Sequence, residues 1–255
     1  MYNIVAIVTP YYKNGKINWN ILNFLIIYHI FNKNNNILFL GTTGESNIFK
    51  KQDYFNLSKF IINYKINCFF GVNKNSINDI INICFILKMN NVIAILLTPI
   101  SFILPNNLYV YKYYKIISKV GIPIIFYNIP KRTGIIISNF LIKKLSNKII
   151  FSVKNSYNKK NNLLLKKNNI IIFIGEDTYL KNGIKLKFSG SISVIINLLP
   201  KYFKYIKIIN INFIKNFVLN KNPIFIKYIL FKNCLINNFI FFFDINNFYL
   251  TQSQI

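Results

Sequence analysis

The chain has 255 residues, of which 53% are hydrophobic, and its 32 Lys and Arg against 6 Asp and Glu give a formal net charge of +26. This length suits one large core, and the abundance of apolar side chains excludes an intrinsically disordered chain. The charge does not indicate a nucleic-acid partner, because the basic residues are scattered through every segment and no spaced aromatic motif accompanies them. The excess of Lys, Asn, Ile, Phe and Tyr, whose codons are rich in A and T, favours mutational bias as its origin.

The sequence predicts a cytoplasmic protein with no membrane association. Residues 1–10 lack the basic start and apolar stretch of a signal peptide. The apolar runs near 21–31 and 239–243 are interrupted well before the ~18 to 20 residues that span a bilayer. Cys68, Cys84 and Cys234 lie far apart and form no C-x-x-C pair, which fits a reducing compartment.

Short apolar runs rich in Ile, Val and Phe alternate along the chain with longer segments in which apolar residues recur every three or four positions. The runs predict strands over 4–8, 36–40, 68–72, 92–97, 122–127, 149–153, 170–174 and 191–195. The longer segments predict helices over 19–31, 51–63, 77–88, 108–118 and 139–145. Strands that are apolar throughout are buried on both faces, so we expect a parallel sheet covered by helices and closed into an α/β (β/α)8 TIM barrel.

A doubly wound open sheet is the alternative architecture. It normally carries a Gly-rich phosphate-binding turn after its first strand, and the Thr-Pro-Tyr-Tyr sequence at 9–12 is unlike one. The alternation of strands and helices ends after about residue 199. We therefore predict a barrel catalytic domain over 1–199, then the last barrel helix and a short C-terminal helical appendage over 200–255, with a break at Pro223.

Function in such a barrel is expected in the loops that follow the strands. Lys154 follows the apolar run 149–153 at the end of the sixth predicted strand. Partial desolvation there would leave some free amine, the species that attacks a ketone carbonyl. In a chain this rich in lysine, a solvated strand end is the alternative reading.

Two further segments carry candidate functional groups. The loop Gly-Thr-Thr-Gly-Glu-Ser at 41–46 brings the Thr42 and Thr43 hydroxyls and several backbone N–H groups into one turn, which suits a carboxylate, although a plain turn is the alternative. Tyr127 ends the fifth predicted strand, where its phenol could move protons, although a core aromatic is the alternative for any one of 17 tyrosines.

Few residues are available for other chemistries. His29 is the only histidine and falls on the apolar face of a predicted helix, so a Ser-His-Asp triad or a histidine metal site lacks its components. Glu176 and Asp177 form the adjacent carboxylate pair after the seventh predicted strand. We expect them in a polar loop or at a helix N-terminus, not in acid–base catalysis.

In order and spacing, motifs along nearly the whole chain resemble the dihydrodipicolinate synthase family of pyruvate-dependent lyases, which includes N-acetylneuraminate lyase. They lie at 4–10, 41–46, 127–134, 153–154, 175–177, 190–194 and 222–224. The resemblance implies a class I aldolase that condenses pyruvate with L-aspartate 4-semialdehyde to 4-hydroxy-tetrahydrodipicolinate, in lysine and diaminopimelate biosynthesis. It implies no metal and no organic cofactor.

The resemblance also implies a role for each matching residue. Lys154 would form an imine with pyruvate, and the protonated imine would act as the electron sink that lets the methyl carbon become a nucleophile. Tyr127 and Thr42 would pass protons to and from the substrate. Thr43 and neighbouring N–H groups would hold the pyruvate carboxylate.

The residues expected to select the second substrate follow the fifth and eighth strands. Arg132 would clamp the carboxylate of the aldehyde, because a guanidinium meets both oxygens at once. Its Arg-Thr-Gly setting is similar to that of the synthases, whereas sialic acid lyases tend to differ there. The main-chain carbonyl of Ile192 would face the lysine.

The chain departs from the family pattern in two loops. The family's proton relay usually includes a tyrosine from a neighbouring subunit in the loop after the fourth strand, but residues 98–105 contain none. We hypothesise that Ser101 or a water molecule replaces it with some loss of rate. The lysine-feedback region after Ser46 has Ile48, Phe49, Lys51 and Tyr54 where relatives often carry polar residues and histidine, so the resemblance does not imply inhibition by lysine.

Family members are commonly tetramers built from dimers, so the resemblance implies a homotetramer or homodimer. Two other functions stay open. One is a related pyruvate-dependent aldolase with another aldehyde partner, and the other is a degenerate, non-catalytic binding protein that uses the basic surface. A covalent pyruvate adduct on Lys154 separates the enzymes from the binding protein.

Overall fold

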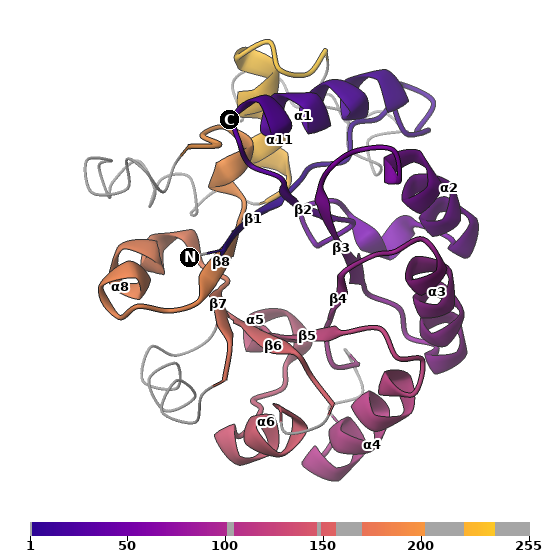
Figure 1. Cartoon of the computed structure of the whole chain (residues 1–255), viewed down its shortest axis with the longest axis vertical. Helices are drawn as coiled ribbons and strands as arrows, with labels where there is room; N and C mark the ends of the chain where they lie inside the picture. Colours follow the sequence, from indigo (N-terminus) through magenta and orange to yellow (C-terminus); the bar gives the residue numbers. More distant parts are fainter. Residues whose placement is uncertain (1, 101–104, 147–148, 157–169, 202–221, 238–255) are drawn as a thin grey trace.

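The predicted strands pair in parallel and close into one barrel (Figure 1), so the (β/α)8 expectation is confirmed. The computed structural model describes residues 2–100, 105–146, 149–156, 170–201 and 222–237. Neighbouring strands pair in sequence order, and β1 pairs with β8 to close the sheet. The strands are β1 (Tyr2–Ala6), β2 (Asn36–Phe39), β3 (Asn67–Val72), β4 (Ala94–Leu97), β5 (Ile124–Asn128), β6 (Ser152–Asn155), β7 (Ile172–Ile174) and β8 (Gly190–Ser193).

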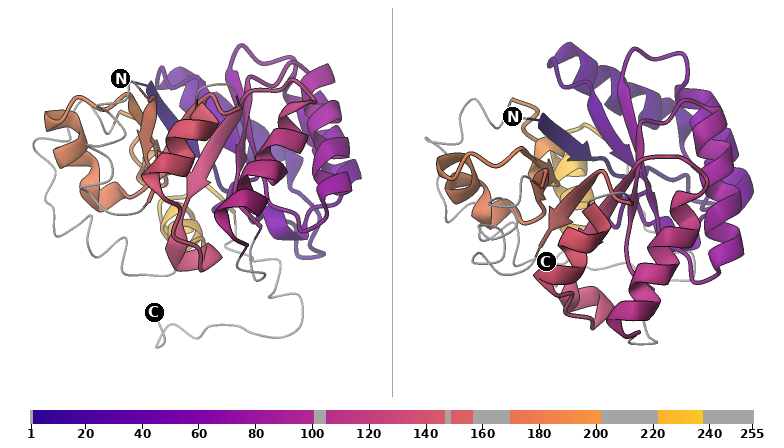
Figure 2. Two further views of the ribbon diagram at one scale, coloured as in Figure 1. Left: turned by 90° about the horizontal axis from the view of Figure 1, so that it is seen from below. Right: turned by 60° about the horizontal axis from the view of Figure 1, so that its bottom comes forward.

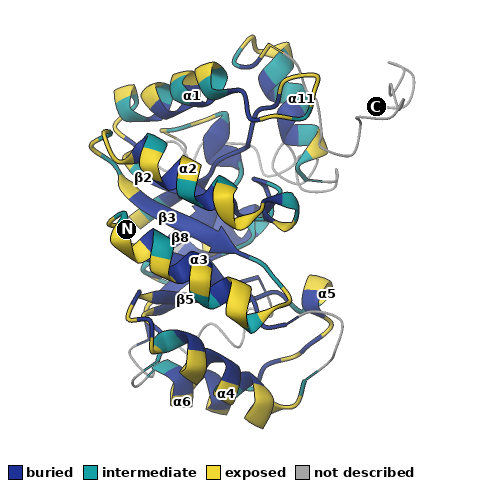
Figure 3. Cartoon of the chain, turned by 90° about the vertical axis from the view of Figure 1, so that its right-hand side faces the viewer, coloured by how far each residue is buried: buried dark blue, intermediate teal, exposed yellow. Residues whose placement is uncertain are grey.

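Helices cover the outside of the barrel, as the two further views in Figure 2 show. They are α1 (Trp19–Phe31), α2 (Lys51–Ile61), α3 (Ile77–Met89), α4 (Asn107–Ser118), α5 (Pro130–Thr133), α6 (Asn139–Ser146), α8 (Leu180–Lys185) and α11 (Ile224–Lys232), with short 3-10 helices η1 (Ser46–Ile48), η2 (Asp177–Tyr179) and η3 (Ile195–Asn197). Figure 3 shows their buried faces toward the strands and their exposed faces outward.

Local sequence explains where three of the helices begin. The side chains of Asn18, Ser76 and Asn106 accept a hydrogen bond from the backbone N–H three residues further on. Each bond satisfies a donor that the first turn of α1, α3 or α4 cannot satisfy within the helix. These caps set the length of the loops that lead out of the barrel strands.

Side chains alternate along each strand between the barrel interior and the helices. The interior cluster consists of Ile4, Ala6, Leu38, Phe69, Ala94, Leu96, Ile125, Tyr127, Ile129, Phe173 and Ile192. A larger cluster fills the layer between strands and helices, and Val153, Ile172 and Ile174 belong to it. Burial of each large apolar side chain contributes about 1.5 to 3 kcal/mol, so both clusters hold the strands in place.

The sixth strand differs from its prediction, because it begins at Ser152 and not at residue 149. The N–H groups of Ile149 and Ile150 bond to the carbonyl of Leu145 at the end of α6, so these apolar residues close the helix. The first strand likewise ends at Ala6 and not at residue 8. The N–H of Val8 donates to the Asn197 side chain, which replaces a strand partner.

Most of the predicted C-terminal region, 202–221 and 238–255, lies outside the described residues. The part that is described, residues 222–237, contains α11, which packs against η3 (Figure 1). None of the described helices has both the length and the apolar character of a membrane span.

Candidate active site

Lys154 lies inside the barrel. It is the third residue of β6, where it pairs with Tyr127 of β5 and Phe173 of β7. Partners in a parallel register point to the same face of the sheet, and both of these residues belong to the interior cluster. The side chain of Lys154 is accordingly buried, with the residue 5% exposed. The sequence predicts Lys154 at the end of the sixth strand, and it is the third of the four residues of β6, which begins at Ser152 and not at residue 149.

The lysine side chain is in contact with an aromatic ring. Its Nζ atom lies 4.4 Å from the centre of the Tyr127 ring, and Tyr127 is itself buried. A ring face attracts an ammonium group. The arrangement keeps the amine beside a phenol inside the barrel.

Gly175 makes room for the lysine stem. A Cβ at this position, directly after β7, would lie 3.1 Å from the Lys154 Cε atom and 2.0 Å from the Ser156 Oγ atom. Only glycine fits without moving these groups. The sequence motif 175–177 contained this residue, but its packing role depends on a contact across two strands that the sequence does not reveal.

Asp177 joins the loops that follow β7 and β8. It begins η2, and its Oδ2 atom accepts hydrogen bonds from the backbone N–H groups of Val194 and Ile195, each at 3.2 Å. Burial raises the pKa of this carboxyl group, while the N–H donors and the charge of Lys154 act in the opposite direction. Its neighbour Glu176 instead lies 3.6 Å from Lys131 at the surface. Asp177 is therefore a buried carboxyl group that ties the loop after β8 to the loop after β7, next to the site.

The threonine loop, residues 41–46, leaves the carboxyl end of β2. Thr43 is 2% exposed, and its Oγ1 accepts a hydrogen bond of 2.9 Å from Asn222. On the other side of the loop the Thr9 hydroxyl donates to the Gly44 carbonyl at 2.9 Å. A Cβ on Gly44 would lie 3.0 Å from backbone atoms of Leu40, so the turn needs glycine at this point. Thr42 is half-buried.

The other predicted site residues occupy different surroundings. Ile192 is buried in β8, opposite Ile4, and belongs to the interior cluster. Arg132 is exposed in α5, shortly after Tyr127. Because the strands are parallel, their carboxyl ends lie at one mouth of the barrel. The threonine loop and α5 begin at this mouth, and β6 ends there. Ser101 lies outside the described residues.

His29 is buried in α1, as its position on an apolar face predicts. Burial lowers its pKa to about 4. In the described part of the chain, no three side chains of His, Cys, Asp or Glu come close enough together to hold a metal ion.

The chain is similar to known proteins over most of its length. The profile of the Dihydrodipicolinate synthetase family matches residues 2–230. The chain belongs to this family. A 4-hydroxy-tetrahydrodipicolinate synthase of Wigglesworthia glossinidia brevipalpis is 32% identical over 206 residues, which are 77% of this chain and 69% of the relative. Another of Thermosipho africanus (strain TCF52B) is 31% identical over 245 residues, 91% and 82% of the two chains.

A solved structure extends the family likeness to the whole fold. Dihydrodipicolinate synthase from Acinetobacter baumannii, in complex with pyruvate, superposes with a TM-score of 0.88 at 27% identity and covers 99% of this chain and 94% of its own. The family predicted from the sequence is confirmed. The predicted activity, that of a 4-hydroxy-tetrahydrodipicolinate synthase and therefore of a lyase in lysine biosynthesis, is the activity of the family's named members.

Proposed function

We propose that the chain condenses pyruvate with L-aspartate 4-semialdehyde to 4-hydroxy-tetrahydrodipicolinate through a Schiff base on Lys154. The observation that carries the proposal is the burial of this lysine inside the barrel beside Tyr127, in a member of the dihydrodipicolinate synthetase family. A buried amine at the mouth of a barrel is a nucleophile that water does not fully solvate. No metal or organic cofactor enters the proposed reaction.

The first half of the reaction uses the amine and the phenol. The unprotonated Lys154 amine attacks the keto carbon of pyruvate, and the carbinolamine loses water to leave a protonated imine. Tyr127 passes protons to the departing oxygen and from the methyl carbon, with Thr42 as the second group in the relay. Loss of a methyl proton converts the protonated imine to an enamine. The electrons of the C–H bond form the new C=C bond, and the electrons of the C=N double bond become a lone pair on nitrogen.

The second half joins the two substrates. The enamine carbon attacks the aldehyde carbon of aspartate semialdehyde, the aldehyde oxygen takes up a proton, and the imine to Lys154 forms again. The amino group of the semialdehyde then attacks the imine carbon, which closes the ring, leaves a C=N bond within it and releases the Lys154 amine. The Thr43 hydroxyl and the N–H groups of the threonine loop hold the pyruvate carboxylate throughout. Arg132, exposed at the same mouth, is free to reach the carboxylate of the incoming aldehyde. The carbonyl of Ile192 faces the lysine in this scheme.

We infer further that the chain works in the cytoplasm as a homo-oligomer, a homodimer or homotetramer. The support is the family pattern, in which a neighbouring subunit completes each site. Light scattering on the purified protein tests the assembly, and a monomer of 30.1 kDa would contradict it.

Ser101 or a water molecule takes the place of the missing relay tyrosine, and Ser101→Tyr should then raise the turnover rate.

The residues of the lysine-feedback region support the inference that lysine does not inhibit this enzyme. Phe49 and Tyr54 are both buried, and the Tyr54 hydroxyl donates to the Gly71 carbonyl at 3.1 Å. Side chains committed to the core in this way do not offer polar groups to free lysine. A titration of lysine against initial rate checks this, and half-inhibition at millimolar lysine would contradict it.

A coupled assay with pyruvate and several aldehydes tests the proposed reaction. The expected result is selective turnover of aspartate semialdehyde. Turnover of another aldehyde, with pyruvate still trapped on Lys154, would instead make the chain a related pyruvate-dependent aldolase. A chain that traps no pyruvate and binds nucleic acid in a salt-sensitive way would be the non-catalytic alternative.

A further inference from the structure

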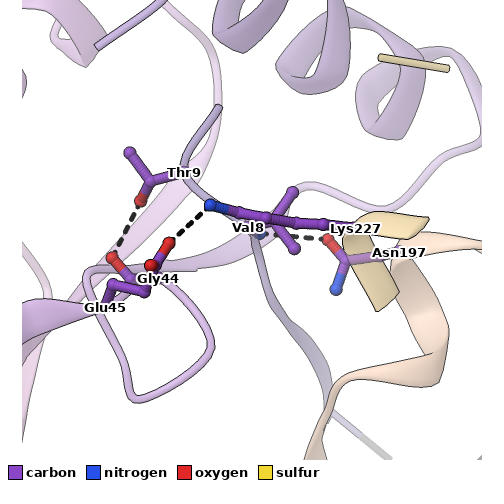
Figure 4. Close-up of polar contacts among 6 residues, drawn as sticks. All are labelled: Val8, Thr9, Gly44, Glu45, Asn197 and Lys227. Atoms are coloured by element: carbon purple, nitrogen blue, oxygen red, sulfur yellow. Dashed lines mark hydrogen bonds and ion pairs between the residues drawn. The ribbon is translucent and has the colours of Figure 1, made fainter. Parts of the chain in front are cut away.

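A second group of buried side chains lies behind the threonine loop and has no role in the proposed chemistry. Glu45, in this loop, forms an ion pair with Lys227 of α11, with 2.5 Å between Oε2 and Nζ. Their side chains are 8% and 1% exposed. The Lys227 Nζ atom also lies 4.2 Å from the centre of the Tyr11 ring. Figure 4 shows Lys227 extending from α11 to Glu45.

Glu45, Lys227 and Tyr11 interact electrostatically with one another. Burial raises the pKa of Tyr11, and the nearby charge of Glu45 raises it further, which keeps the phenol neutral beside the ion pair. Buried ion pairs can often be replaced by apolar residues with no loss of stability. Stability alone therefore does not account for a pair placed in this loop.

The backbone of the loop needs support from outside. Glu45 has a φ of 59° and Leu40 a φ of 47°, both in the left-handed region that disfavours residues with a side chain. These residues flank the Gly-Thr-Thr-Gly turn on its two sides. The ion pair to Lys227 holds the turn at Glu45, one of these two positions.

Asn222 acts on the same loop at Thr43. Its amide nitrogen donates to the Thr43 Oγ1, so one lone pair of the hydroxyl is occupied and its proton is directed elsewhere. A hydroxyl that accepts from Asn222 can donate to a carboxylate. Asn222 and Lys227 belong to one short segment, the residues just before α11 and its first turns, so a single element fixes the loop at two points.

The charge of the loop also indicates a role for Lys227 in substrate binding. A loop that is to hold a carboxylate contains the carboxylate of Glu45, which would repel the ligand if it were left alone. Lys227 neutralises it at close range. The pair thus lets the loop keep its shape without carrying a net negative charge toward the barrel mouth.

We propose that Asn222 and Lys227 are positioning residues for pyruvate: Lys227 fixes and neutralises Glu45, and Asn222 orients the Thr43 hydroxyl toward the pyruvate carboxylate. The inference rests on the proposed function of the threonine loop. It assigns to the C-terminal segment a part in substrate affinity, although neither residue touches the reacting atoms.

The test measures the pyruvate concentration that gives half-maximal borohydride trapping, together with the trapping rate at saturating pyruvate. Lys227→Met and Asn222→Asp should each raise that concentration by about 10- to 100-fold, the range expected when hydrogen bonds to a charged group are misdirected. The trapping rate at saturating pyruvate and the KM for the aldehyde should stay close to wild type. Asn222→Asp is nearly isosteric, but its oxygens only accept, so Thr43 would turn its proton away from the substrate.

Lys232→Met is the matched control, because it makes the same substitution at an exposed position of α11. It should bind pyruvate like the wild type. If Lys227→Met does not fold, the double variant Glu45→Gln Lys227→Met, which leaves no unpaired charge, takes its place. Only the support of the turn is lost in this variant, so the expected rise is about tenfold, at the lower end of the range.

The outcomes separate the two proposals. A wild-type protein that traps no pyruvate would overturn the proposed function itself. A wild-type protein that traps pyruvate, together with Asn222→Asp and Lys227 variants that lose thermal stability yet keep wild-type pyruvate affinity, would overturn the positioning role and leave the function standing.

Discussion

Replacing Gly175 with alanine should displace Lys154 and lower activity while the barrel stays folded. The added Cβ would lie 2.0 Å from Ser156 Oγ, and 3.1 and 3.2 Å from the Lys154 Cε and Cγ atoms. The serine hydroxyl must move away, and the lysine stem must shift by a few tenths of an ångström. Overpacking of this kind costs about 1 to 3 kcal/mol. For a chain of this size, that lowers Tm by about 2 to 12 °C.

The effect on activity should exceed the effect on stability. A misplacement of about 1 Å in a reacting group costs on the order of 100-fold in rate. The smaller shift predicted for Lys154 should therefore lower kcat by on the order of tenfold. Initial rates with both substrates at saturation, the rate of borohydride trapping and thermal unfolding followed by circular dichroism measure the three quantities.

Ser156→Ala supplies the control for Gly175→Ala. The Ser156 hydroxyl is buried and has no hydrogen-bond partner among the residues that the structure describes, so its removal should change little. The double variant should regain most of the lost Tm, because the closest contact is gone. It should not regain the lost rate, because the contact with the lysine stem remains. Wild-type rate and Tm in the Gly175→Ala protein would refute the packing argument.

Three other substitutions test separate parts of the site and core. Tyr127→Phe keeps the ring beside the lysine but removes the phenol, and should lower kcat by about 100- to 10,000-fold; Tyr114→Phe, which removes a hydroxyl bonded to a β4 carbonyl, should leave kcat unchanged. Arg132→Ala should lower kcat/KM for the aldehyde by about 10- to 100-fold without changing pyruvate trapping, whereas Lys131→Ala should change neither. Burial lowers the pKa of His29 from 6.5 to about 4. Between these two pH values the unfolded chain binds more protons than the folded chain. The free energy of unfolding therefore falls as the pH drops from 6.5 to about 4, by at most about 3 kcal/mol. His29→Leu should remove this part of the pH dependence of the urea midpoint, and an unchanged dependence would contradict the assignment.

The sequence was sufficient for the order of the barrel elements, because the apolar runs and the helical spacing are local features. It also singled out Lys154, Tyr127 and the threonine loop, each of which follows or ends an apolar run. The shift of β6 was not predictable from the same pattern. Ile149 and Ile150 are as apolar as a strand requires, yet their N–H groups complete the end of α6.

The supports of the site could not be predicted, because they depend on contacts between distant residues. Lys227 lies 182 positions from Glu45 along the chain, and Asn222 lies 179 positions from Thr43. In a chain with 32 Lys and Arg, nothing local marks one lysine as buried. Asp177 could be placed after a strand, but its hydrogen bonds to the loop after β8 follow only from closure of the barrel.

Borohydride reduction in the presence of pyruvate, followed by peptide mapping, shows whether Lys154 forms the imine. We expect a reduced pyruvate adduct on Lys154, and none in a Lys154→Arg protein with the same thermal unfolding profile. An unmodified Lys154 in the wild type, or an adduct on another lysine that persists in the variant, would contradict it.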